Sequence, residues 1–253
     1  MCSYSRLVAI VLGVATAPAL YAQDAPAAGG AGGGARPAEL PLKPARNVAF
    51  TTDEGTWLSL DVSPDGRTIV TDIAGDLYTI PIAGGKATRI SDGLPFDAQP
   101  RWSPDGKKIV YVTDKDGSDD VWVIDADGKN PKQVTRTDRV QWLSPEWTPD
   151  GRYIVVSRNS SLFSTTYALY LFHKDGGSGV RMTPGATPAP GGQGGPGATP
   201  PHRNYVGPAF GKDGRYVYVS SRMGGAAGYN QTGFDWTVVA YDRETGETSQ
   251  RAM

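Results

Sequence analysis

One short phrase recurs four times along the chain, and this repetition limits the possible folds more than any other feature of the sequence. The copies read DVSPDGRTIVTD (61–72), RWSPDGKKIVYVTD (101–114), EWTPDGRYIVVSR (146–158) and AFGKDGRYVYVSS (209–221). The spacings of the turn glycine are 40, 45 and 63 residues between its successive positions, Gly66, Gly106, Gly151 and Gly214. Self-similarity at such a period is typical of chains that repeat one small structural unit.

The Ser-Pro-Asp-Gly segment predicts a tight turn. Pro64 and Pro104 set φ for the second turn position, and Asp65 and Asp105 can accept hydrogen bonds from nearby backbone amides. The glycine that follows accepts the left-handed conformation which closes a hairpin after such a turn. The third copy replaces Ser with Thr148, and the fourth copy, GKDG, lacks both Ser and Pro.

Each turn lies between segments rich in β-branched and aromatic residues, which predict strands. First strands are expected at 56–62, 99–102, 144–147 and 206–210, and second strands directly after the turns. Third strands are expected at 76–82, 120–125, 167–173 and 236–242. Fourth, more polar strands are expected at 87–91, 132–135 and 180–183, with a weak one at 248–252.

The spacing of 63 residues has a compositional explanation. Residues 184–201, PGATPAPGGQGGPGATPP, contain only Pro, Gly, Ala, Thr and Gln, which predicts a disordered insert. Without these 18 residues the spacing is 45 (63 − 18). Four-stranded antiparallel units at this period are typical of β-propeller blades, which must stack because one sheet cannot bury two apolar faces alone. The predicted fold is therefore all-β, with four blades that we expect to be part of a larger ring.

The N-terminal 44 residues are expected to lie outside the propeller. Residues 1–22 predict a secretory signal peptide, with charged Arg6, an apolar run at 7–20 and cleavage after Ala22. The apolar run is shorter than the ~20 residues that a membrane span needs. Residues 23–44, rich in Ala, Gly and Pro, predict a disordered linker. The propeller is expected at 45–253, with blades at about 53–93, 94–137, 138–205 (with the insert 184–201) and 206–253. The signal peptide predicts an exported protein, periplasmic or extracellular.

Composition and motifs exclude several function classes. The 25 basic and 26 acidic side chains give no electrostatic reason to expect nucleic acid as a partner. His173 and His202 are the only histidines, and we interpret them as strand-end and loop residues because no second His or Cys completes a metal set. The acidic run DKDGSDD (114–120) lacks the spacing of a calcium loop and is interpreted as a polar hairpin loop. No Gly-x-Ser-x-Gly elbow is present. We expect no catalytic, cofactor-binding or metal-ligating residue in this chain.

The aromatic residues divide into expected core and expected surface. Trp102, Trp147 and Phe210 share the repeat position before the turn, and Trp122 shares a third-strand position with Tyr78 and Tyr170, so these six are predicted to be core. Trp57 and Trp142 fit the repeat less clearly and are the better candidates for a binding surface. Long loops are expected at 157–167 and 221–236, on the face where blades usually bind partners.

The repeated hairpin, with Leu-Tyr or Val-Trp on the next strand, resembles the WD-like propeller repeats of the TolB family over residues 47–253. Three longer phrases, at 50–70, 76–93 and 238–249, resemble the N-terminal propeller of bacterial exported proteins with a downstream amidohydrolase domain. That resemblance implies a non-catalytic propeller that gates or positions substrate for a metal-dependent catalytic domain. The partner is then that downstream domain, and a divalent metal is expected only there.

Two other functions remain open from the sequence. One is a stand-alone periplasmic TolB-like scaffold that binds protein partners, and the other is the propeller of a secreted serine peptidase. Residues 47–52 resemble an outer strand, and we expect them to belong to a final blade that this chain lacks. Pairing of residues 47–52 with 236–242 would instead favour a closed ring of four blades.

Overall fold

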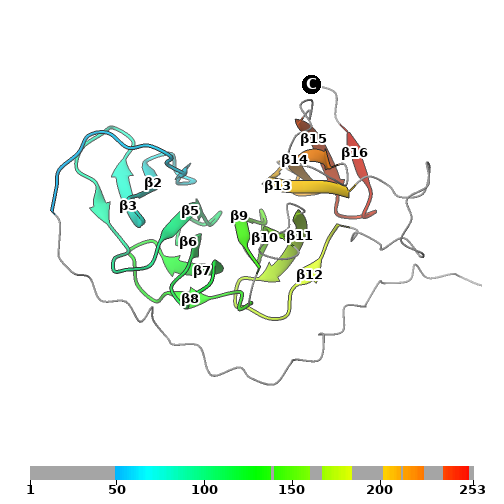
Figure 1. Ribbon diagram of the computed structural model, residues 1–253. Helices are drawn as coiled ribbons and strands as arrows, with labels where there is room; N and C mark the ends of the chain where they lie inside the picture. The colour runs from blue at the N-terminus through cyan, green and yellow to red at the C-terminus, as the bar shows by residue number, and fades with distance from the viewer. Residues whose placement is uncertain are drawn as a thin grey trace, which may run out of the picture. The chain divides into compact units, whose positions relative to one another are not determined.

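The computed structural model describes residues 49–137, 140–159, 167–183, 202–211, 213–224 and 236–250 (Figure 1). All of them belong to one compact unit, Arg36–Met253. The predicted signal peptide, the linker and the insert at 184–201 lie outside the described residues, as do most residues of the two long loops. No helix in the described part of the chain has the length and apolar character needed to cross a membrane.

Four antiparallel sheets of four strands each make up the described part of the protein. The first sheet contains β1 (Leu60–Val62), β2 (Thr68–Ile73), β3 (Asp76–Pro81) and β4 (Thr88–Arg89). The second contains β5 (Asp97–Trp102), β6 (Lys108–Thr113), β7 (Asp120–Asp125) and β8 (Lys132–Gln133). The third contains β9 (Trp142–Trp147), β10 (Tyr153–Asn159), β11 (Tyr167–His173) and β12 (Val180–Arg181). The fourth contains β13 (His202–Phe210), β14 (Tyr216–Gly224), β15 (Trp236–Asp242) and β16 (Thr248–Gln250).

The strands of every sheet follow one another in chain order, so each sheet is a meander. This arrangement confirms the prediction of four propeller blades. The four-stranded meanders do not close on one another, because among the described strands those of the first sheet contact the second sheet alone. Described residues 49–52 form no strand, and β15 pairs with β14 and β16, so the pairing required by a closed four-blade ring is not observed in this part of the chain.

The repeated turns have the geometry that their sequence predicts. The amide of Gly66 donates to the carbonyl of Ser63 at 2.8 Å, and Gly66 has a φ of 71°, in the left-handed region. The Ser63 hydroxyl donates to Asp65 at 2.6 Å, and the amide of Arg67 donates to the same carboxylate at 3.1 Å. These two hydrogen bonds favour the ionised carboxylate and lower the pKa of Asp65. Both contacts recur at the second and third turns, with Thr148 in place of Ser in the third. The fourth turn keeps the contact from the Arg215 amide to Asp213, at 3.1 Å.

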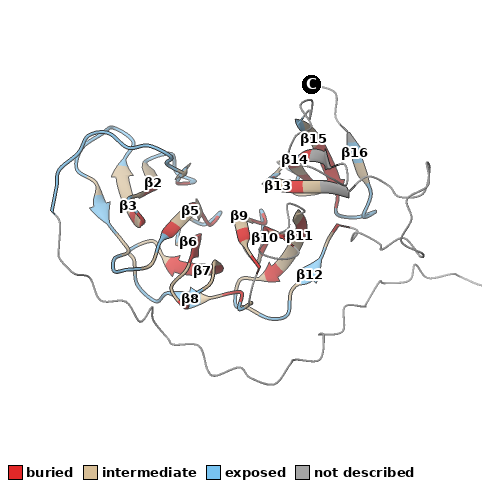
Figure 2. Ribbon diagram, in the orientation of Figure 1, coloured by how far each residue is buried: buried red, intermediate tan, exposed pale blue. Residues whose placement is uncertain are grey.

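The first strands form the inner edge of the sheets. Neighbouring first strands contact one another, β1 with β5, β5 with β9 and β9 with β13, whereas each fourth strand contacts only the third strand of its own sheet (Figure 1). We call β1, β5, β9 and β13 the inner strands. The outer strands are little buried, and both residues of β4 and both residues of β12 are exposed (Figure 2).

The hydrophobic core lies between neighbouring sheets and not within any one of them. Val70 and Leu77 of the first sheet pack with Trp102, Ile109 and Tyr111 of the second. The second and third sheets share a larger cluster, and the third and fourth share one more. Because every sheet buries apolar residues on a neighbour, stability comes from the contacts between repeats.

Candidate functional site on the inner strands

One repeat position on the inner strands carries charged side chains in three successive sheets. Asp61, Arg101 and Glu146 each pair with a buried valine of the second strand, and Ala209 has the same place in the fourth sheet. We call these four residues the inner column. The side chains of Arg101 and Glu146 are 31% and 25% exposed, so solvent reaches both.

The inner column connects neighbouring sheets. The backbone amide of Trp102 donates to Asp61 Oδ2 at 2.8 Å, and Arg101 Nη1 donates to the carbonyl of Leu60 at 3.1 Å. Arg101 Nε lies 3.6 Å from Glu146 Oε2, and the indole N–H of Trp147 donates to the carbonyl of Arg101 at 3.2 Å. The side chains therefore satisfy backbone groups that the inner edge of a sheet leaves without a strand partner.

The surroundings of Glu146 in this column alter its acidity. Burial raises its pKa to about 7, against the opposing attraction of Arg101, and the negative charge of Asp61 raises it further. The backbone amide of Trp147 donates to Glu146 Oε1 at 3.0 Å. A carboxyl group that is half protonated at neutral pH and open to solvent can accept or donate a hydrogen bond to a bound partner.

Backbone strain occurs two residues before the charged column positions. Gln99 and Ser144 have φ values of 57° and 53°, and Gly207, at the equivalent place, has a φ of 64°. Each residue precedes a proline, and the pairing with the second strand shifts register at this point, which marks a β-bulge. A residue with a side chain costs roughly 1–2 kcal/mol in this conformation. Strain of this kind is concentrated at functional sites, which makes the inner strands the candidate site.

Hydrogen bonds hold the strained residues in place. The amide of Gln99 donates to Asp72 Oδ2 at 3.0 Å, and the amide of Ser144 donates to Gln99 Oε1 at 2.5 Å. Asp72 also accepts from the amide of Ser59 at 2.7 Å. A continuous set of contacts thus runs through the inner strands of the first three sheets, and it can position a ligand or a protein partner.

The histidines do not form a catalytic or metal-binding group among the described residues. His173 ends β11, where its Nδ1 accepts a hydrogen bond from the amide of Asp175 at 3.2 Å and its ring packs edge-on against Tyr153. His202 begins β13, but its side chain lies outside the described part. Within the described ranges no group of three or more His, Cys, Asp or Glu residues could hold a metal ion.

The acidic run 114–120 uses its carboxylates for internal hydrogen bonds. Asp114 accepts from the amide of Phe96 at 2.7 Å, and Asp116 accepts from Gln133 at 2.6 Å. Asp120 accepts from the hydroxyl of Thr135 at 2.7 Å. These contacts are those of a polar hairpin loop, as the sequence predicts.

The core predictions for the aromatic residues are confirmed in part. Trp102 and Trp147 are buried in the core clusters. Trp122, Tyr170 and Phe210 are partly buried and pack against these clusters, and Tyr78 is partly buried. Trp57 is 100% exposed. The prediction of a surface position for Trp142 is wrong, because its side chain is only 2% exposed and packs edge-on against Tyr170 and Phe172.

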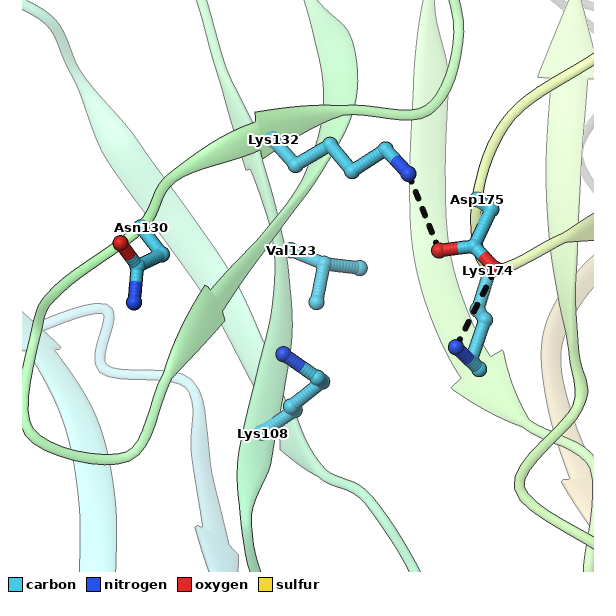
Figure 3. A pocket seen from close by; sticks show the side chains of 6 residues that line it. All are labelled: Lys108, Val123, Asn130, Lys132, Lys174 and Asp175. Carbon is cyan, nitrogen blue, oxygen red and sulfur yellow. Dashed lines mark hydrogen bonds and ion pairs between the residues drawn. The ribbon is translucent and has the colours of Figure 1, made fainter.

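A shallow pocket on the described surface is the weaker candidate site. Its volume is about 160 Å³, and Figure 3 shows its lining residues Lys108, Val123, Asn130, Lys132, Lys174 and Asp175. Lys132 and Lys174 both pair with Asp175, at 2.9 and 3.2 Å, and Lys108 pairs with Asp125 at 2.5 Å. Because each amine already has a carboxylate partner, the pocket has little remaining capacity to bind an anion.

The inner column and the strained residues were not predicted from the sequence. The available signal was the recurring pattern of a proline two residues before the aromatic residue, in QPRW, SPEW and GPAF. Read with the repeat, that pattern places Arg101 and Glu146 at one position, but their mutual contact depends on how neighbouring sheets pack.

Comparison with known proteins supports this fold assignment. Residues 59–190, just over half of the chain, match the family described as the Tricorn protease N-terminal beta propeller domain. The chain is similar to Tricorn protease homolog 1 of Streptomyces coelicolor, with 32% identity over 95 residues, which are 37% of this chain and 9% of that protein. It is also similar to the Tol-Pal system protein TolB of Francisella tularensis subsp. mediasiatica, with 26% identity over 154 residues, covering 41% of this chain and 35% of that protein.

The structural similarity extends over more of the chain. The structure of a putative TolB from Agrobacterium tumefaciens has a TM-score of 0.56 and 19% sequence identity, and the match covers 76% of this chain and 60% of that one. The chain thus spans only part of the length of these relatives. The repeats, the four blades and the match to the family model together show that the chain is a TolB-like β-propeller. It belongs to the family of the Tricorn protease N-terminal beta propeller domain.

Proposed function

We propose that this chain is the non-catalytic propeller portion of a larger exported hydrolase, and that it admits or positions substrate for a separate catalytic domain. The observation that carries the proposal is the match of residues 59–190 to a propeller that is the N-terminal domain of a protease. The small share of Tricorn protease homolog 1 that the match covers, 9%, is consistent with a propeller module within a much longer protein. Export is proposed from the signal-peptide pattern at 1–22.

The proposed catalytic partner is a metal-dependent amidohydrolase domain, and a divalent metal would be bound there. This choice rests on the resemblance of the phrases at 50–70, 76–93 and 238–249 to propellers of that class. A serine peptidase domain is the alternative that the similarity to a Tricorn protease homologue favours. In either case the partly exposed side chains of Arg101 and Glu146 in the inner column supply polar groups for contact with a substrate.

A TolB-like scaffold that binds protein partners is the second candidate function. The similarity to TolB of Francisella tularensis and to the TolB structure from Agrobacterium tumefaciens favours it. In this case the inner column would contact a protein partner, and no hydrolase activity would accompany the native protein.

The mass of the native gene product tests the hydrolase proposal. An antibody raised against residues 45–253 is used on a periplasmic extract, with the 26.8 kDa chain as the size standard. A much larger band, whose immunoprecipitate hydrolyses amide or ester substrates and loses activity with a metal chelator, is the expected result. If a reagent specific for active serines labels the larger band, the catalytic domain is a serine peptidase and not an amidohydrolase. A band no larger than 26.8 kDa would overturn the proposal.

A further inference from the structure

Three loops of the first two sheets meet around Phe96, at the end of the strands opposite to the repeated turns. The β4–β5 loop carries Phe96, the β2–β3 turn contains Gly75, and the β6–β7 loop begins with Asp114. A methyl group added at Gly75 would lie 3.1 Å from Cδ2 of Phe96, and the amide of Phe96 donates to Asp114 Oδ1 at 2.7 Å. The Phe96 side chain thus lies where the loops of the first and second sheets meet.

Two apolar side chains of the β4–β5 loop are exposed although the backbone is held in place. Phe96 is 63% exposed and Leu94 is 42% exposed. Next to the bonded Phe96 amide, the amide of Asp97 donates to the carbonyl of Gly75 at 2.8 Å. Because the first and second sheets already pack on each other here, a further blade of a larger ring would pack on other faces and leave this loop uncovered. A firmly held, exposed aromatic residue is typical of the anchors in protein interfaces, because it offers contact area at little cost in conformational entropy.

Acidic residues are concentrated in the same three loops. The segments 74–76, 89–97 and 114–120 contain seven acidic residues and two basic ones, Arg89 and Lys115. Their formal charge is therefore −5 (2 − 7), whereas the whole chain has a formal charge of −1. A local excess of one sign produces a potential that attracts a partner of the opposite charge.

The basic residues of these loops neutralise only part of this charge. The guanidinium of Arg89 lies 3.3 Å from Asp76 and 3.6 Å from Asp92, and the side chain of Asp92 remains 77% exposed. In the second sheet, burial raises the pKa of Asp119, and the negative charge of Asp114 raises it further. Both of these side chains are partly exposed, and a cation placed beside them would reduce their mutual repulsion.

We propose that a short basic segment of a separate partner protein binds this loop surface. The surface, which we call the Phe96 surface, consists of Leu94, Phe96, Asp92, Asp114 and Asp119. An apolar side chain of the segment packs on Leu94 and Phe96, and its lysine or arginine side chains pair with the carboxylates. A permanent contact with another domain of the same protein would be larger and more apolar, whereas a small apolar patch with an acidic border fits a segment that binds and dissociates. The inference holds for any catalytic domain that accompanies the propeller.

Fluorescence anisotropy of a labelled hexapeptide tests the proposal, with the protein at its native length produced from the whole gene. The peptide has two lysines on each side of a central Leu-Trp pair, and its acidic analogue has glutamates in place of the lysines. The basic peptide is expected to bind, more weakly at high salt, and the acidic analogue is expected not to bind. Phe96→Ala is expected to raise the Kd about tenfold and Asp92→Lys about threefold or more.

Matched substitutions at the opposite end of the first two sheets serve as controls. Ile82 is 51% exposed after β3, and the side chain of Asp127 is 57% exposed after β7, so Ile82→Ala and Asp127→Lys make the same chemical changes away from the Phe96 surface. Both controls are expected to bind the basic peptide as the unaltered protein does, and far-UV circular dichroism checks that every variant is folded. No binding by the native-length protein, as when its own downstream part covers the surface, would overturn the proposal. Equal binding of the two peptides, or a folded Phe96→Ala protein with unchanged Kd, would also overturn it.

Discussion

Replacement of Glu146 by glutamine measures how much an ionised carboxyl group on the inner strands lowers the free energy of unfolding. Burial raises the pKa of Glu146 from its ordinary value of 4.5 to about 7. A carboxyl group with a raised pKa stabilises the folded state fully below its unfolded pKa, and that contribution is lost as the pH rises through the folded pKa. Above pH 7 the folded protein therefore holds a carboxylate that the unfolded chain accommodates at lower free energy.

The magnitude follows from the difference between the two pKa values. Each unit of difference between the folded and unfolded pKa values changes the free energy of unfolding by about 1.4 kcal/mol. The difference between 4.5 and about 7 therefore gives an upper bound of about 3 kcal/mol. Because the side chain of Glu146 is 25% exposed, solvent screening reduces the expected effect to roughly 1–2 kcal/mol. Glutamine has nearly the same shape and can still accept the hydrogen bond from the Trp147 amide.

Urea unfolding at pH 4 and pH 8 measures this effect. The free energies of unfolding of the two proteins are expected to be nearly equal at pH 4, below the unfolded pKa, and Glu146→Gln is expected to be more stable by roughly 1–2 kcal/mol at pH 8. Burial also raises the pKa of Asp76, Asp97 and Asp119, so only the difference between the two proteins reports on Glu146. A difference that does not change with pH, or a less stable variant at pH 8, would show that the ion pair with Arg101 outweighs burial.

Two further predictions concern the core and the repeated turn. Ile154 is completely buried between the second and third sheets, and Ile154→Ala is expected to lower the free energy of unfolding by about 2–4 kcal/mol. The control is Ile82→Ala, at a 51% exposed position, which is expected to change that free energy by less than about 0.5 kcal/mol. Equal effects in urea unfolding would contradict the assignment of the core to the space between sheets. Gly106→Ala, at a φ of 68°, is expected to cost about 1–2 kcal/mol by the same assay, and a neutral result would mean that this turn adopts another conformation.

The strands and turns were largely predictable because their signals are local. The third strands at 120–125, 167–173 and 236–242 agree with β7, β11 and β15 in both bounds. The fourth strands are shorter than predicted, because only two residues of β4, β8 and β12 pair with their neighbours. In the third sheet the first strand, β9, begins at Trp142, earlier than predicted. Trp142 therefore lies in the core.

The candidate site was not predictable in the same way. Arg101 and Glu146 are 45 residues apart in the sequence (146 − 101), and no local rule indicates that their side chains lie 3.6 Å apart. The left-handed conformation of Gln99 is also unexpected, because a residue with a side chain disfavours it. That conformation is stabilised by the hydrogen bond that the Gln99 amide donates to Asp72 in the preceding sheet and by the one that the Gln99 side chain accepts from the Ser144 amide in the following sheet.

The sequence by itself determined the repeat, its turns and its four-stranded units, because turn chemistry and strand periodicity act over a few neighbouring residues. Only the tertiary structure decided which side chains meet on the inner strands and that burial raises the pKa of Glu146. These properties depend on the packing of one sheet on the next, which brings together residues that are a full repeat apart.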